Sequence, residues 1–362
     1  MTNLKTSQEL QSKVIDFLRF PLIIGVLFIH NSASTIQIDG GVVFGSGENM
    51  PLMYYCSNLF SKVIAAIAVP LFFFMSGFLF FLNVNKFSRQ TYKNKLSSRI
   101  KSLLIPYLFW NFIVLSFYYV VSFIPQLNQY INGGNIDLHK FWIYFWDSGS
   151  GYPVSYQFWF IRNLMIVVLL SPIIYFFCSK AKIYGVLLLG ILWYLGLWVN
   201  ITGFSAVSVF FFTAGAYLGI NKRNLLDDFG KIRTLSFVLY PTIAVADLLT
   251  RKYAFNNYIH NAGIVIGIIF CFNLVSYLFE RQKIKPMKFL SAASFFVYAI
   301  HEPFLIVTFR KIFYMIFSPQ TDLATTTLYF LNVILAVLVA LGIYYVLQQC
   351  LPKFTSIITG GR

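Results

Sequence analysis

Ionisable side chains interrupt several of the longest apolar runs in this sequence. His30 closes the first run, which begins at Val14, and the adjacent pair His301–Glu302 interrupts a late run over residues 290–314. Such groups are costly in apolar surroundings and are therefore candidates for function. Because a neutral imidazole can accept a proton near physiological pH, the pattern indicates general-base catalysis by a histidine.

The first run also carries Asp16 and Arg19, and Arg19 precedes His30 by eleven residues. At about 100° per residue, this spacing makes three helical turns plus about 20°, so Asp16, Arg19 and His30 share one narrow stripe. The rise of about 1.5 Å per residue separates Arg19 from His30 by roughly 16 Å. The stripe indicates a path through the protein. Alternatively, Arg19 extends to the membrane surface and pairs with Asp16, while His30 lies at the interface.

Two other runs carry polar groups. Arg162 follows Trp159 near the start of the run 157–178, at about the depth of His30, and Asn111 follows Trp110 near the middle of the run 102–124. An arginine at this depth needs a partner, and Glu302 is a candidate. Alternatively, Arg162 extends to the membrane surface beside an interfacial Trp159.

The pair His301–Glu302 also has a structural interpretation. Pro303 follows directly. A proline inside a helix removes one backbone hydrogen bond, and the freed carbonyl could serve the two polar side chains.

The composition is that of an integral membrane protein. The 362 residues are 58% hydrophobic and 11% charged, with a mean hydropathy of +0.71. Soluble domains carry about 25% charged residues. A membrane-spanning helix needs about 20 apolar residues. Runs of about this length, or nearly so, occur at about 14–33, 58–83, 102–124, 157–178, 184–199, 203–220, 235–250, 259–279, 290–314 and 325–349. We expect an all-α fold: a polytopic bundle of about ten transmembrane helices, forming one domain over residues 1–362 with its core at about 12–348.

Basic residues concentrate in alternate connecting segments. With the N-terminus inside, the inside segments hold basic clusters within 86–101, 180–182, 222–233 and 281–288, whereas the outside segments 34–57 and 315–324 hold none. The outside segment 125–156 holds Lys140 alone, and Arg251–Lys252 are the exception. The positive-inside rule then predicts cytoplasmic termini and a multi-pass protein of the cell (inner or plasma) membrane.

Membrane topology thus explains the net charge of +16, and no nucleic-acid partner is expected. The four cysteines form no zinc pattern, so no metal site is expected.

These residues stand in blocks that resemble the acyltransferase-3 family of multi-pass membrane acyltransferases. The first-span motif of that family, a basic residue followed after ten residues by a histidine, corresponds to Arg19 and His30. Four further blocks follow in the order of the family: Pro-Leu-Phe-Phe-Phe-Met-Ser-Gly-Phe at 70–78, Leu-Ile-Pro-Tyr at 104–107, Phe-Trp-Phe-Ile-Arg at 158–162, and Tyr298-x-x-His301-x-Pro303. The resemblance covers about residues 12–348. The family often has Arg-x-x-Arg before the third span; here Arg99 fills the first position and Ser102 the second, with Lys101 beside it.

The resemblance implies transfer of an acyl group, usually acetyl, from cytoplasmic acyl-CoA to a sugar hydroxyl on the far side of the membrane. We therefore expect acetyl-CoA or another acyl-CoA as co-substrate and no tightly bound cofactor. The expected partners are the lipid bilayer and a cell-surface polysaccharide or lipid-linked glycan. The basic segment 86–101 and Arg19 suit the phosphates of CoA, and its thin pantetheine arm can span the distance to His30.

The expected site has three parts. The catalytic residues are His30, as general base or acyl carrier, with Arg162, His301 and Glu302. The acyl-CoA site comprises Asp16, Arg19, Arg99 and Lys101. The substrate pocket comprises Asn111, Trp159 and Tyr298. Arg162 or His301 would stabilise the oxyanion that develops on the thioester carbonyl.

Two other functions compete with acyl transfer. A transporter or flippase of a glycan or lipid-linked precursor would also place polar groups along a membrane path, and a sensor or structural subunit could keep a vestigial site. Five motif blocks and a basic inner mouth without inverted-repeat symmetry favour the enzyme over the transporter. Retention of Arg19, His30 and His301 together argues against a vestigial site. The sequence does not define the acceptor, the acyl group (acetyl or succinyl) or the oligomeric state.

Overall fold

Helices build almost the whole of the structure. The computed structural model describes residues 2–32, 35–38, 41–45, 50–124, 136–149, 151–199 and 201–361, with the backbone alone for 2–6, 35–38, 41–45 and 138. The elements are α1 (Thr2–Asn31), β1 (Thr35–Ile38), β2 (Gly41–Gly45), α2 (Pro51–Ser57), η1 (Asn58–Ile64), η2 (Ala65–Ile67), α3 (Ala68–Phe81), α4 (Arg89–Arg99), η3 (Ile100–Leu104), α5 (Ile105–Ser122), η4 (Leu138–Lys140), α7 (Phe141–Tyr144), η5 (Tyr156–Phe158), α8 (Trp159–Leu169), α9 (Ser171–Tyr194), α10 (Ala206–Ile220), α11 (Leu225–Gly230), α12 (Arg233–Thr250), α13 (Asn256–Glu280), α14 (Lys288–Ile300), η6 (His301–Leu305), α15 (Ile306–Phe317), α16 (Asp322–Cys350) and α17 (Pro352–Ile358).

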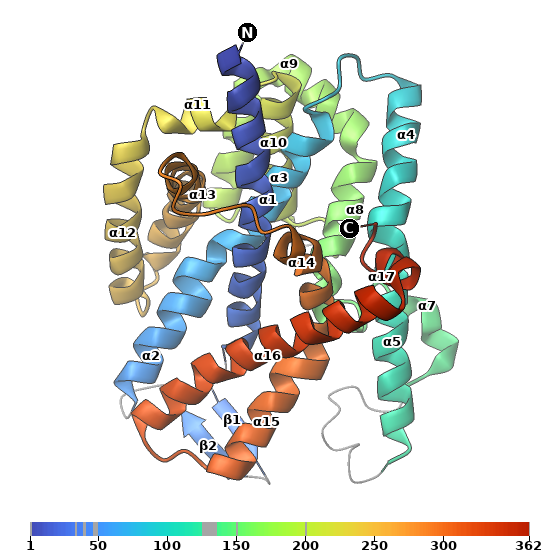
Figure 1. The fold of residues 1–362 in the computed structure, drawn as a ribbon, viewed down its shortest axis with the longest axis vertical. Helices are drawn as coiled ribbons and strands as arrows, with labels where there is room; N and C mark the ends of the chain where they lie inside the picture. The colour runs from blue at the N-terminus through green and yellow to red at the C-terminus, as the bar shows by residue number, and fades with distance from the viewer. Residues whose placement is uncertain are drawn as a thin grey trace.

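The long helix α1 runs through the middle of the bundle (Figure 1), where α14, α13, η1 and α3 pack against it. Each of the ten predicted apolar runs overlaps a helix. Six helical segments of the described chain are long and apolar enough to cross a bilayer: Pro51–Phe81, Arg89–Ser122, Ser171–Tyr194, Asn256–Glu280, Lys288–Phe317 and Asp322–Cys350. The all-α class and the membrane character are therefore confirmed, whereas ten crossings and cytoplasmic termini remain predictions.

The helix breaks in residues 157–199 do not coincide with the gap that the sequence predicts between the runs 157–178 and 184–199. The backbone leaves helical geometry at Leu170, between α8 and α9, and again at Lys182 inside α9, where φ is 50° and ψ is −138°. The break at Lys182 splits α9 into halves of about 17 Å, each too short to span a bilayer alone. Joined across Leu170, α8 and the first half of α9 reach the length expected for the run 157–178.

Two short strands form an antiparallel hairpin that the sequence did not indicate. The strands β1 and β2 pair from Thr35 with Gly45 to Ile38 with Gly41, and the register shifts between Ile36 and Gln37. The hairpin follows α1 directly and so belongs to the His30 end of the bundle (Figure 1).

Several of the predicted inside segments meet at the N-terminal end of α1. Ser7 donates to Asp227 over 3.2 Å, and Lys222 donates to Asn85 over 2.7 Å. These bonds bring the start of α1, the segment after α3 and the segment between α10 and α11 to one end of the bundle. The basic clusters that these segments carry therefore share one side, as the charge pattern predicts.

Glycines bring α3 and α10 into direct backbone contact. A Cβ atom added to Gly77 would lie 2.0 Å from the carbonyl oxygen of Phe212, and one added to Gly215 would lie 1.9 Å from that of Phe74. Only hydrogen fits at these positions, and such close approach is a common means of packing helices in membranes.

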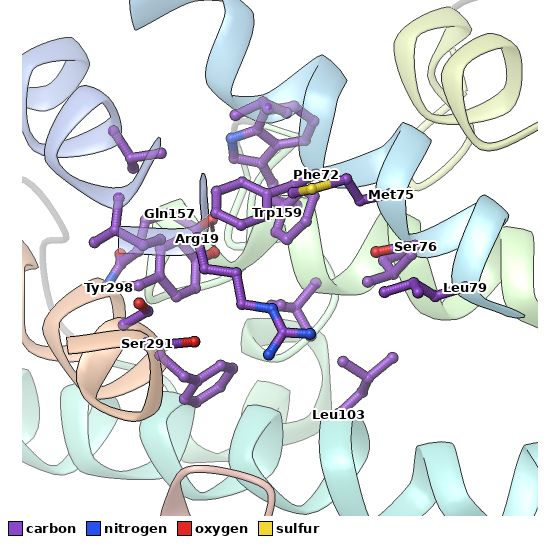
Figure 2. A pocket seen from close by; sticks show the side chains of 18 of the residues that line it. Arg19, Phe72, Met75, Ser76, Leu79, Leu103, Gln157, Trp159, Ser291 and Tyr298 are labelled. Carbon is purple, nitrogen blue, oxygen red and sulfur yellow. Dashed lines mark hydrogen bonds between the residues drawn. The ribbon is translucent and has the colours of Figure 1, made fainter. Parts of the chain in front are cut away.

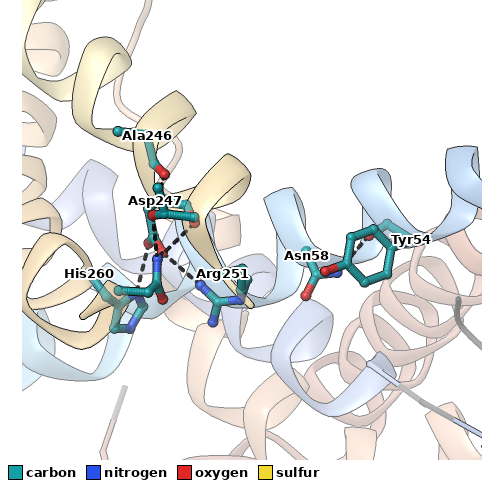
Figure 3. Close-up of polar contacts among 8 residues, drawn as sticks. Tyr54, Asn58, Ala246, Asp247, Arg251 and His260 are labelled. Carbon is teal, nitrogen blue, oxygen red and sulfur yellow. Dashed lines mark hydrogen bonds and ion pairs between the residues drawn. The ribbon is translucent and has the colours of Figure 1, made fainter. Parts of the chain in front are cut away.

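The turn between α12 and α13 is closed around a buried carboxylate (Figure 3). Asp247 accepts hydrogen bonds from Arg251 (2.9 Å) and Asn256 (2.8 Å), and its second oxygen lies 2.8 Å from Nδ1 of His260. Arg251, the exception to the charge rule, is therefore neutralised by an ion pair within its own turn.

Replacing Gly215 by alanine is expected to separate α3 from α10, because the added methyl group overlaps a carbonyl oxygen. We expect the Gly215→Ala protein to lose about 1–3 kcal/mol of unfolding free energy, measured by thermal unfolding in detergent. Gly342→Ala in α16 is the matched control, since its added Cβ meets no atom within 4 Å apart from the backbone of its own helix. Equal stability of the two variants would contradict the close contact.

Candidate active site

One cavity of about 140 Å³ connects Arg19 to His30. Its wall is built from residues of α1, α3, α8 and α14, and is completed by Gln157 of η5 and by Arg99 and Leu103 at the junction of α4 and η3. Five residues of α1 line it: Ile15, Arg19, Ile23, Val26 and His30. Residues spaced by three and four positions share a helix face, so Arg19 and His30 of the predicted stripe face this cavity, whereas Asp16 lines the wider cavity described below.

The Arg19 end of the cavity is strongly cationic. The Arg19 side chain extends into the cavity between the side chains of α3 and α14 (Figure 2). Arg99 lines the same cavity and repels Arg19 electrostatically. Asp16 pairs with Arg19 at 3.1 Å but is half exposed, so it screens the positive charge only in part. An anion is therefore attracted to this end.

The structure separates Lys101 from this cationic group. Lys101 is exposed, and the described wall of the cavity does not include it. Lys95 lies closer, because its ammonium and the Arg99 guanidinium sit over the same Phe80 ring at 5.5 and 5.9 Å. Lys95, one helical turn before Arg99, therefore provides the neighbouring cation, and Lys101 does not.

A wider cavity of about 580 Å³ adjoins the Arg19 end, and we call it the vestibule. Ile15, Arg19 and Leu79 line both cavities. The rest of the vestibule wall is mostly polar and includes Gln8, Gln11, Ser12, Asp16, Asn83, Asn85, Lys222, Arg223 and Asn224. A broad polar chamber thus leads past Arg19 into a narrow, mainly apolar passage that ends at His30.

At the other end, four side chains from three segments meet: His30 of α1, Tyr156 of η5, and His301 and Glu302 of η6. The Tyr156 hydroxyl lies 2.8 Å from Nδ1 of His30, and the ring of His301 lies 5.0 Å from the His30 ring. Glu302 shares a side-chain hydrogen bond with Tyr156. The predicted meeting of His30, His301 and Glu302 is therefore present.

A break in the helix places His301 and Glu302 against His30. Glu302 has extended backbone angles, φ −126° and ψ 140°, and a cis peptide bond joins it to Pro303. Pro303 has no N–H to donate to the carbonyl of Ala299 four residues earlier. Gln157 of η5 donates instead, to the carbonyls of Ala299 (3.3 Å) and Glu302 (2.6 Å). The freed carbonyl is thus served by a side chain that also lines the cavity.

His301 is held in one orientation by its own helix. Its Nδ1 lies 2.5 Å from the carbonyl oxygen of Tyr298, which can only accept a hydrogen bond. In the neutral ring the proton is therefore on Nδ1, and Nε2 carries a lone pair. This Nε2 is buried and has no hydrogen-bond partner among the described residues.

The residues predicted for the substrate pocket divide into two groups. Trp159 and Tyr298 line the cavity, and the Tyr298 hydroxyl donates to the carbonyl of Gln157 over 2.6 Å. Asn111 is fully buried behind the wall, where it accepts from the N–H of Ser155 over 3.2 Å and donates to the carbonyl of Tyr107. It anchors α5 to the residue that precedes Tyr156.

Arg162 supports the loop before η5 rather than the cavity wall. Its guanidinium donates to the carbonyls of Trp146 and of Gly151, the latter over 3.0 Å. Arg162 makes no ion pair among the described residues, so the suggested Arg162–Glu302 pair is absent. In the same loop, backbone N–H groups of Gly149 and Gly151 bond to Asp147 and hold the pKa of its carboxyl below its usual range. The cation that acts on Glu302 is Arg310 of α15.

Sequence reasoning did not identify Tyr156, Gln157, Arg310 or the vestibule cations Lys222 and Arg223 as site residues. Tyr156 is one of 23 tyrosines, and nothing in its local sequence distinguishes it. Gln157 and Arg310 are polar groups within or beside predicted apolar runs. The cost of such groups in a membrane is the signal that could have identified them.

Comparison with known proteins identifies the family. A family model described as "Acyltransferase domain", that of the acyltransferase-3 family, matches residues 13–346. The chain belongs to this family. The match includes every residue that lines the passage to His30, and all of the vestibule wall except Gln8, Gln11 and Ser12 at the start of α1.

A curated relative is similar over nearly its full length. The chain is 24% identical over 358 residues to the succinoglycan biosynthesis protein ExoH of Rhizobium meliloti, covering 96% of this chain and 92% of the relative. No solved structure matches the chain.

Replacing Arg162 by methionine tests whether this residue supports the fold or acts in the reaction. The variant leaves two carbonyl groups without their donor, so we expect it to lose about 2–3 kcal/mol of unfolding free energy, measured by thermal unfolding in detergent. The acyltransferase that remains folded should keep most of its activity. Arg281→Met, at an exposed arginine, is the control. Unchanged stability with lost acyl transfer would instead place Arg162 in the chemistry.

Proposed function

We propose that this acyltransferase moves an acyl group, most simply acetyl, from cytoplasmic acyl-CoA to a hydroxyl group of a cell-surface polysaccharide or lipid-linked glycan. The transfer crosses the cell membrane, in which the protein is a multi-pass component. One observation carries the proposal: a single cavity joins the Arg19–Arg99 pair to His30. A negatively charged donor and a neutral acceptor would thus meet from opposite ends.

The cationic end suits the donor. CoA carries phosphates on its nucleotide, and guanidinium groups such as those of Arg19 and Arg99 bind phosphates well. The vestibule, about four times larger than the passage, offers room and a further cation at Lys222, whereas Arg223 is paired with Asp228. The thin pantetheine arm would then follow the roughly 16 Å of α1 between Arg19 and His30. The cytoplasmic position of this end follows from the positive-inside rule.

The His30 end suits an acceptor that carries hydroxyl groups. Three buried side-chain atoms there have no partner among the described residues: Oε1 of Gln157, Nε2 of His301 and Oε2 of Glu302. All three are hydrogen-bond acceptors when Glu302 is ionised. Buried acceptors without partners are costly, so they favour a ligand that brings donors. Sugar hydroxyls are such donors, and the relative named for succinoglycan biosynthesis supports a polysaccharide acceptor.

The chemistry follows from these positions. His30 takes the proton of the acceptor hydroxyl, whose oxygen attacks the thioester carbonyl carbon. The carbon–sulfur bond then breaks, the sulfur leaves with a proton, and the products are an ester and free CoA. In the alternative route His30 attacks first and carries the acyl group to the hydroxyl. His301, with a lone pair on Nε2, would accept a hydrogen bond from the acceptor hydroxyl and orient it.

Replacing His30 by alanine is expected to abolish transfer, because the only imidazole that lines the described cavity is removed. The measurement is incubation of labelled acetyl-CoA with membranes that contain either protein, followed by mass analysis of the glycans. Equal amounts of folded protein are confirmed by thermal unfolding in detergent. Full transfer by the folded variant would reject His30 as base and as acyl carrier.

Removing either cation at the donor end is expected to weaken donor binding. Arg19→Ala and Arg99→Ala should each raise the KM for acyl-CoA about tenfold, equivalent to one lost charge-assisted hydrogen bond, with a smaller effect on kcat. Lys101→Ala is the matched control, because Lys101 is exposed and lies outside the described wall. A KM that rises for Lys101→Ala but not for the other two would place the donor elsewhere.

A further inference from the structure

Among the residues that the structure describes, one cation of the vestibule wall is balanced by no carboxylate. The cationic side chains of this wall are Arg19, Lys222 and Arg223. Arg19 pairs with Asp16 at 3.1 Å, and Arg223 pairs with Asp228. Lys222 takes part in no ion pair within the described chain. Its charge is therefore available to an anionic ligand in the vestibule.

The ammonium group of Lys222 is held at the vestibule wall by a neutral partner. It donates to Oδ1 of Asn85 over 2.7 Å, and both residues line the vestibule. Asn85 follows α3 and Lys222 follows α10, so the lysine side chain crosses from one turn to the other. A lysine ammonium has three N–H donors, and the amide oxygen takes one of them. The positive charge and the other donors can serve a ligand.

The backbone of Lys222 adopts a conformation that glycine favours. Its φ is 51°, in the left-handed region. The N–H of Lys222 donates to the carbonyl of Gly219, and the N–H of Arg223 donates to that of Leu218, both over 3.0 Å. These two bonds close the end of α10 as a Schellman motif, in which the left-handed position is most often glycine. They also fix the point from which the Lys222 side chain leaves the backbone.

The donor in the proposed function has two separate anionic groups. Acyl-CoA carries a diphosphate between its pantetheine arm and its nucleoside, and a phosphate monoester on the 3′-oxygen of its ribose. With the diphosphate at Arg19 and Arg99 and the thioester at His30, the nucleoside would extend away from the passage into the vestibule. The 3′-phosphate, with nearly two negative charges at neutral pH, would then lie in the same chamber as Lys222.

The rest of the vestibule wall suits the nucleoside that carries this phosphate. Five carboxamide side chains line the vestibule: Gln8, Gln11, Asn83, Asn85 and Asn224. A carboxamide has one donor group and one acceptor group, and adenine presents both along its edge. A cation set among carboxamides therefore matches a phosphorylated adenine nucleoside.

We propose that Lys222 binds the 3′-phosphate of the acyl-CoA donor and makes the protein select CoA over donors that lack this phosphate. This inference rests on the proposed function, which supplies the donor. A diphosphate is common to many nucleotides, so the Arg19–Arg99 pair alone does not distinguish CoA from them. Lys222 supplies the second contact, and its compact charge on a flexible stem suits a phosphate monoester. Specificity thus comes from two cationic points set apart in the wall.

The test compares acetyl-CoA with 3′-dephospho-acetyl-CoA in membranes that contain the full-length wild type or Lys222→Gly. We expect the wild type to use acetyl-CoA about tenfold more efficiently in kcat/KM, equivalent to one charge-assisted hydrogen bond. Lys222→Gly should lose this preference through a higher KM for acetyl-CoA, with kcat little changed. Because glycine favours the left-handed conformation, the variant should fold as the wild type does. Lys222→Arg, which keeps the charge, should retain the preference.

Gln282→Gly is the matched control for the change of backbone. Gln282 has the same left-handed conformation, with φ 54°, and closes the end of α13 with the same pair of backbone hydrogen bonds. It lies outside the described wall of the vestibule, so Gln282→Gly should keep the wild-type preference. Equal use of the two donors by the wild type would overturn the proposal. A preference that survives in Lys222→Gly, or an equal loss in Gln282→Gly, would also overturn it.

Titration calorimetry of the purified protein with CoA and with 3′-dephospho-CoA tests the site without the reaction. We expect the Kd for CoA to be about tenfold lower in the wild type, and the two Kd values to be equal in Lys222→Gly. If this difference appeared while neither acetylated donor gave transfer, the proposed function would fail and the phosphate site would stand. Equal Kd values in the wild type, or no binding of either compound, would overturn the site.

Discussion

The fixed rise and rotation of α1 set the geometry on which the site depends. A continuous helix advances about 1.5 Å and turns about 100° per residue, so Arg19 and His30 are held far apart and still face the same cavity. The neighbouring helices need only leave a gap along that face. The close backbone contact of α3 with α10 keeps one wall of the gap rigid, because a helix held by its own backbone has little freedom to shift.

The two ends of the gap solve the problem of polar groups in an apolar bundle in opposite ways. At the Arg19 end, the positive charge of Arg19 and Arg99 is only partly compensated beside the wide, polar vestibule, which favours binding of an anionic ligand. At the His30 end, almost every donor is used internally, and what remains are acceptors. The molecule therefore presents positive charge at one end and hydrogen-bond acceptors at the other, and under the proposed function these would select the donor and the acceptor respectively.

The sequence predicts the features that depend on local periodicity. Apolar runs locate the helices, and the spacing from Arg19 to His30 locates the face of α1 that lines the cavity. The cost of a buried charge singles out His301 and Glu302.

Features that depend on tertiary neighbours were not predictable. Arg162 and His30 look alike as polar groups in apolar runs, yet Arg162 binds backbone carbonyls in a loop. Lys101 is adjacent to the family motif in sequence but is exposed, and Tyr156 reaches His30 only because η5 packs beside α1.

The position of His30 within α1 has a consequence for the reaction. His30 lies in the last turn of the helix, just before Asn31 ends it. The aligned peptide dipoles of a helix concentrate partial negative charge at the carbonyl end, and a cation placed there gains about 0.3–1 kcal/mol, or up to about 2 when partly buried. In the proposed reaction, His30 removes a proton from a hydroxyl group and becomes such a cation. The macrodipole of α1 would then stabilise the transient imidazolium. The helix that separates Arg19 from His30 would thus also assist the proton transfer at its carboxyl end.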